Sequence, residues 1–150
     1  MPQVETHPPH PAVERVYPLR RPSGRVEPFP TIYYLRDAGL MRAMSELERH
    51  HHVREIERRL AEDAELMAAY HADHAAYRDT RWAMLTEPDR AAVEASPSLR
   101  RSFRGGIAGI ADFNYVKCLH AQYAYHLARG EQGGTTAGRL IDALLSADSG

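Results

Sequence analysis

The stretch YVKCLHAQYAYHLAR, residues 115–129, carries the pattern that decides the fold class. Its apolar side chains recur at helical spacing and fall on one stripe, which is typical of a helix packed against a core. The stripe consists of Val116, Leu119, Tyr123 and Leu127. Asn114 and Gly130 flank the stretch and are typical start and stop residues of a helix. The stretch therefore predicts a helix over residues 115–129.

The same spacing predicts further helices along the chain. Asp37 is a candidate N-cap for a helix that ends near the run 50–52 of three histidines, and Asp63 caps another. Pro88 and Pro97 suit the first turns of two short helices. The expected core residues are Leu40, Met44, Leu47, Ile56, Leu60, Leu66, Tyr70, Val116, Leu119, Tyr123, Leu127, Leu140 and Leu144.

The first thirty residues have a different composition. They contain eight of the ten prolines, and proline fixes φ and lacks a backbone donor. The segment FPTIYYL, residues 29–35, is the most strand-like part of the chain. It has no strong partner strand in the sequence, so extended packing on helices is the alternative. We predict a mostly α fold: a proline-rich extended arm over residues 1–28 and a single helical domain over residues 29–150.

Length and charge exclude several classes of protein. The chain has 150 residues, of which 43% are hydrophobic, enough for one domain with a core. Nineteen basic and twenty acidic residues give a net charge of −1, unlike a strongly basic nucleic-acid binder. The single cysteine excludes an internal disulfide and a four-cysteine zinc site. No apolar run reaches the roughly 18 residues of a membrane helix, and no signal-peptide pattern begins the chain. We expect a cytoplasmic protein.

A basic and glycine-rich pattern lies between Leu99 and His120. Glycines permit close approach of a ligand to the backbone, a helix start favours anions, and arginines bind oxyanions through two parallel hydrogen bonds. The predicted ligand-binding residues are Arg100, Arg101, Arg104, Gly105, Gly106, Gly109, Lys117 and His120. The pattern matches neither a P-loop nor a dinucleotide fingerprint. We predict a binding module for a phosphate-bearing ligand, such as a nucleotide, polyphosphate or RNA; a flexible loop beside a solvated basic patch is the alternative.

Cys118 and His120 are the candidate catalytic residues. They lie about 200° apart on a regular helix, so they can share a metal only if the helix begins after Cys118. Cys118 could also act as a nucleophile beside Lys117 near a helix start. A metal-dependent hydrolase or transferase is therefore an alternative function. His71 and His74 share a helix face, which we interpret as solvated.

Several blocks together resemble a known family. The blocks FPTIYYL, GLMRAMSELE, LAEDAELMAAYHADHAAY and VKCLHAQYAYHLARG resemble the bacterial domain-of-unknown-function family 501, over about residues 7–142. The resemblance implies a small cytoplasmic protein of a family common in actinobacteria, with no established activity. Genes of the family often lie near those for an exopolyphosphatase-like phosphatase and a cell-division coiled-coil protein. A second alternative is therefore a helical interaction protein in cell division or envelope assembly.

The resemblance also implies a metal site. Similar proteins carry a cysteine in the arm, a cysteine or histidine just before the first helix, and the cysteine and histidine of the block VKCLH. The corresponding positions here are His7 (with His10 nearby), Asp37, Cys118 and His120. All of these residue types can bind a borderline metal such as zinc. A site assembled from these segments would explain why a proline-rich arm docks on the domain.

Overall fold

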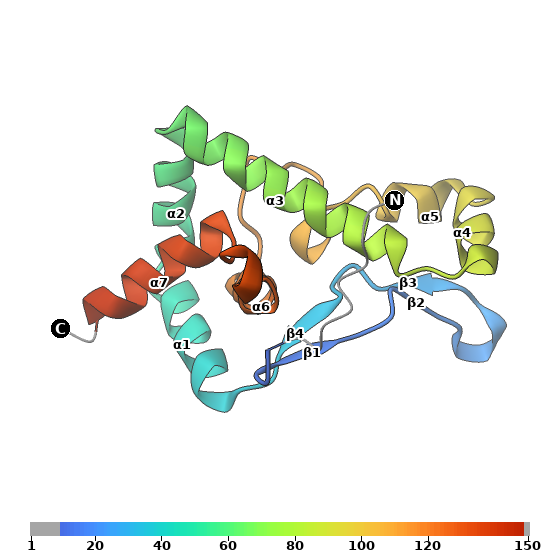
Figure 1. Ribbon diagram of the computed structural model, residues 1–150, viewed down its shortest axis with the longest axis horizontal. Coiled ribbons are helices and arrows are strands. Elements are labelled where there is room, and N and C mark those ends of the chain that lie inside the picture. Colours follow the sequence, from blue (N-terminus) through green and yellow to red (C-terminus); the bar gives the residue numbers. More distant parts are fainter. Residues whose placement is uncertain (1–9, 149–150) are drawn as a thin grey trace.

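Helix α6 (Leu119–Ala128) lies at the centre of the molecule, with the other elements around it (Figure 1). The structure is a computed structural model that describes residues 10–148. α6 contacts strand β4 (Tyr33–Leu35) and the helices α1 (Ala38–Arg49) and α7 (Thr136–Asp148). Every residue of α6 from Leu119 to Tyr125 except His120 is buried, because neighbours pack on several of its faces.

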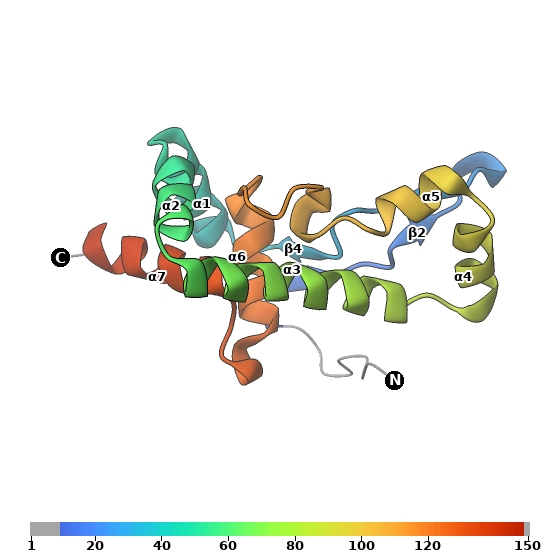
Figure 2. The ribbon, with the colours of Figure 1, turned by 90° about the horizontal axis from the view of Figure 1, so that it is seen from above.

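The long helix α3 (Ala64–Ala83) connects the two ends of an elongated molecule (Figure 2). One end holds α1, α2 (His52–Ala61) and α7, and the other holds α4 (Glu87–Glu94) and α5 (Pro97–Ser102). Short 3-10 helices complete the fold: η1 (Pro22–Gly24), η2 (Ile107–Gly109) and η3 (Gly130–Gln132). Asp37 and Asp63 accept backbone hydrogen bonds as the N-caps of α1 and α3, as predicted. The mostly α fold is thereby confirmed.

The strand-like segment has a partner, contrary to our expectation. Strand β1 (Val13–Arg15), from the arm, pairs antiparallel with β4. A second pair joins β2 (Leu19–Arg20) to β3 (Glu27–Pro28). β1 is a proline-free triplet in which Val13 is buried and Glu14 exposed, so it suits a half-buried strand. Such a short run is too weak a signal to identify from the sequence.

The central helix starts four residues later than we predicted. Cys118 has extended backbone angles (φ −147°, ψ 118°) and occupies the N-cap position in place of Asn114. The residues just before it are not helical, and the Tyr70 hydroxyl of α3 donates to the carbonyl of Tyr115 at 2.7 Å. The Glu48 carboxylate accepts the first N–H of α6. Contacts with distant segments thus override the local signal for a helix start.

The hydrophobic interior has two parts. The main core surrounds α6, and every predicted core residue is either buried in it or packed against it, which confirms the prediction. A smaller core at the α4–α5 end was not predicted; it consists of Leu19, Leu85, Val93, Leu99 and Phe103. The arm contributes a buried residue to each core. Within residues 10–148, no helix has the length and apolar character needed to span a membrane.

Candidate functional site

An open cleft of about 550 Å³ lies beside α5 and the glycine-rich segment. This arginine cleft is lined by four of the predicted ligand-binding residues: Arg101, Arg104, Gly105 and Gly109. Both guanidinium groups are exposed, and neither forms an ion pair with a described residue. The rest of the lining is Pro30, Ser98, Ser102 and Ala111. The cleft therefore presents positive charge, and no carboxylate among its described lining residues offsets that charge.

The glycine-rich segment allows close packing and offers few free backbone donors. The N–H groups of Gly105, Gly106 and Gly109 all donate to backbone carbonyls in or next to this segment. A Cβ on Gly106 would lie 2.3 Å from Nδ1 of His74, and Gly109 has a φ of +75°. The glycines are thus required by backbone conformation and tight contact. An anion in the cleft would be held mainly by side chains.

A buried arginine without an acidic partner lies behind the wall of the cleft. The Arg81 side chain is fully buried. Its Nε donates to the carbonyl of Phe29 at 2.9 Å, and its two terminal nitrogens donate to the carbonyl and Oγ of Ser102 at 2.7 and 3.1 Å. Burial lowers the pKa of Arg81 to about 10, so the group remains charged at neutral pH. No described carboxylate pairs with it. Nothing local in the sequence distinguishes Arg81 from the other arginines.

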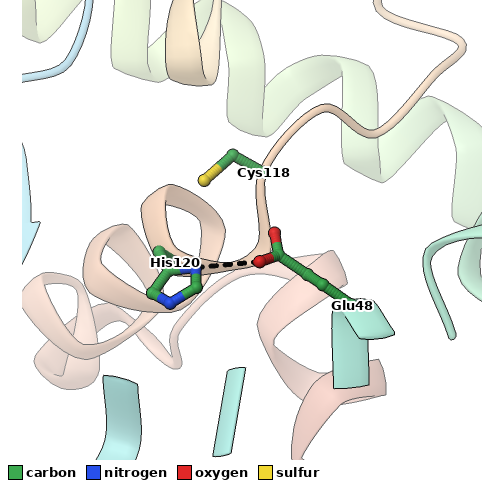
Figure 3. Close-up of side chains that lie close together, drawn as sticks. All are labelled: Glu48, Cys118 and His120. Carbon is green, nitrogen blue, oxygen red and sulfur yellow. Dashed lines mark ion pairs between the residues drawn. The ribbon is translucent and has the colours of Figure 1, made fainter. Parts of the chain in front are cut away.

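A second cluster joins the end of α1 to the start of α6 (Figure 3). It consists of Glu48, Cys118 and His120, whose donor atoms all lie within 4.8 Å of one another. Nδ1 of His120 is 3.1 Å from Oε1 of Glu48, while Oε2 of Glu48 accepts from the backbone N–H of Leu119 at 3.1 Å. The two predicted residues meet because α6 begins after Cys118, the condition stated above. Glu48 was not predicted, since it looks like ordinary surface charge in the sequence.

The other predicted metal ligands take different positions. His7 lies outside the described residues. Nδ1 of His10 accepts a hydrogen bond from the backbone N–H two residues later at 3.0 Å. Asp37 caps α1 at the end opposite Glu48, about 16 Å along the helix axis. The Glu48 cluster therefore contains, of the predicted ligands, the two from the segment VKCLH.

Four predicted ligand-binding residues do not line the arginine cleft. Arg100 is exposed on α5 but is not among the lining residues. Lys117 is exposed in the extended stretch before α6, and His120 belongs to the Glu48 cluster. Gly106 is buried against α3. The predicted anion set is thus divided between the cleft and the start of α6.

The two histidines of α3 differ from the solvated face we expected. Nε2 of His71 is 2.9 Å from Oδ1 of Asn114. His74 is fully buried, stacks on Phe113 with ring centroids 4.6 Å apart, and accepts from the N–H of Ile107 at 3.0 Å. Burial lowers the pKa of His74 to about 4, so the ring is neutral at neutral pH. The interpretation was wrong for His74 because the glycine-rich segment covers it.

Comparison with known proteins identifies a family. No curated protein and no solved structure matches the chain. The profile of a family described as a protein of unknown function (DUF501) matches residues 4–142, which is most of the chain and agrees with the resemblance found in the sequence. The chain therefore belongs to the DUF501 family of proteins of unknown function.

Proposed function

We propose that this protein binds a small ligand through a phosphate group in the arginine cleft. The observation that carries the proposal is the buried charge of Arg81 directly behind a cleft whose rim holds two further unpaired arginines. A buried charge without a counter-ion is costly, and a nearby anion offsets that cost. An oxyanion in the cleft would supply the missing negative charge.

Ser102 connects the buried arginine to the cleft. Its Oγ accepts a hydrogen bond from Arg81, and the residue also lines the cleft. The hydroxyl proton has no acceptor among the described residues, so it is available to donate to an oxyanion. A hydroxyl that accepts from a guanidinium is a stronger donor, because hydrogen bonds in a chain polarise one another. Ser102 would thus contact the phosphate directly and transmit the effect of Arg81.

Arg101 and Arg104 would hold the ligand from the rim. Guanidinium groups bind phosphate oxygens through charge-assisted hydrogen bonds that are stronger than those between neutral groups. The volume of about 550 Å³ falls within the range of small-molecule sites, roughly 300–1,000 Å³, so the cleft has room for more than inorganic phosphate. A chain with a net charge of −1 is better suited to a small phosphorylated molecule than to a long nucleic acid.

The proposal is tested by thermal unfolding at low salt with inorganic phosphate, pyrophosphate, tripolyphosphate, ATP and a short single-stranded RNA. A ligand that binds the folded state raises the midpoint of unfolding. We expect at least one of the small phosphates to raise it, with an effect that declines as salt screens the charges. Stabilisation by RNA alone, or by none of these compounds, would contradict the proposal.

A matched set of variants locates the binding. Arg101→Gln and Arg104→Gln should each weaken binding about tenfold, as expected for loss of one charge-assisted hydrogen bond. Arg100→Gln removes the same charge from α5, the helix that holds Arg101, without touching the cleft, so the affinity of this variant should stay near that of the wild type. Equal effects of all three variants would indicate binding through net charge alone. The interaction-protein alternative stays a prediction.

A further inference from the structure

The Glu48 cluster, at the start of α6, brings together three side chains that can each bind a metal ion. Glu48 comes from α1, while Cys118 and His120 precede and follow the first residue of α6 (Figure 3). A thiol, an imidazole and a carboxylate within 4.8 Å of one another are the donor types that zinc accepts. The side chains are only partly exposed, so they are placed by the fold.

The hydrogen bonds of His120 determine which ring nitrogen carries the proton. Nε2 lies 3.1 Å from the carbonyl oxygen of Met41 and 3.2 Å from Oγ of Ser45. A carbonyl oxygen only accepts, so Nε2 must be the protonated nitrogen. In the neutral ring Nδ1 then carries a lone pair, and this lone pair faces Oε1 of Glu48 at 3.1 Å. Two acceptors at that distance repel each other unless a proton or a metal cation lies between them.

We propose that the cation is a divalent metal ion of the zinc class, bound by Nδ1 of His120, the carboxylate of Glu48 and Sγ of Cys118. In protein metal sites, the ligating histidine usually donates its other ring N–H to a backbone carbonyl or carboxylate, which fixes the orientation of the ring. The contact from His120 to Met41 has this form. The ligating carboxylate is likewise held by hydrogen bonds, as Glu48 is by the N–H of Leu119.

The proposed metal site leaves one coordination position without a protein ligand. Three protein ligands leave one position of a tetrahedral ion free, as in catalytic rather than structural zinc sites. A cavity of about 130 Å³, lined in part by Cys118, His120 and the tyrosines of β4, adjoins the cluster. The cavity has room for water or a small group beside the metal. The site is distinct from the arginine cleft, so a negative result for metal binding would not contradict phosphate binding in the cleft, and the reverse also holds.

The test is metal binding by untagged protein that has been stripped with a chelator and then titrated with Co²⁺ and Zn²⁺. We expect one ion per chain, and with Co²⁺ the absorption band of a cobalt–thiolate bond. Zn²⁺ should displace the cobalt and abolish the band. Because the ion binds the folded state, it should also raise the midpoint of thermal unfolding.

The variants separate this cluster from adventitious binding. Cys118→Ser should abolish the thiolate band, and Glu48→Gln, which keeps an acceptor for the N–H of Leu119, should weaken binding. The double variant His50→Ala, His51→Asn removes exposed imidazoles nearby and should bind as the wild type does; asparagine suits the left-handed backbone of His51. Circular dichroism confirms that each variant is folded. Absence of a thiolate band in the wild type, or loss of binding in the double variant alone, would overturn the proposal.

Discussion

Acidification should destabilise this protein through one buried group, His74. Burial lowers its pKa from 6.5 to about 4 in the folded protein, whereas the unfolded chain retains the ordinary value. Between these values the unfolded chain binds a proton that the folded protein does not bind. The free energy of unfolding is therefore unaffected above this window and falls as the pH is lowered through it. At pH 5 the linkage relation gives a loss of about 2 kcal/mol.

The assay is urea unfolding at pH 7.5 and pH 5, comparing the wild type with His74→Asn. An asparagine oxygen can replace Nδ1 as the acceptor for the N–H of Ile107 but does not titrate. The variant should lose about 2 kcal/mol less than the wild type between the two pH values. His50→Asn changes an exposed histidine and should retain the wild-type dependence. If His74→Asn is as sensitive to acid as the wild type, a different group is responsible and our reasoning fails.

Two further variants test the packing around the sites. Tyr77→Phe removes the hydroxyl that accepts from the N–H of Ile32 at 2.7 Å, which leaves a buried donor unpaired. We expect the free energy of unfolding, measured by urea titration, to fall by about 1–3 kcal/mol. An unchanged value would show that the donor finds another partner. Gly106→Ala places a Cβ against the buried histidine ring and should cost about 1–3 kcal/mol by the same measurement. Gly130→Ala, where a Cβ meets nothing within 4 Å, should be nearly neutral; similar costs for the two alanines would refute the packing argument.

Local sequence determined the helices and the main core. Helical spacing of apolar residues identified the core side chains, and Asp37 and Asp63 marked the starts of α1 and α3. These features depend on residues within a few positions of one another: a cap bonds to an N–H three residues on, and a stripe repeats every turn. Such interactions can be read without knowing which segments meet.

Tertiary structure decided the features that depend on contacts between distant segments. The partner of β4 comes from the arm. α6 starts late because Tyr70 of α3 donates to the carbonyl of Tyr115, and Glu48 of α1 accepts the N–H of Leu119. The same holds for the candidate sites. Glu48 becomes a possible ligand only because α1 packs on α6, and Arg81 becomes a buried charge only because α5 covers it. An isolated residue type does not encode its burial or its long-range partners; these follow from how the whole chain excludes water from its core.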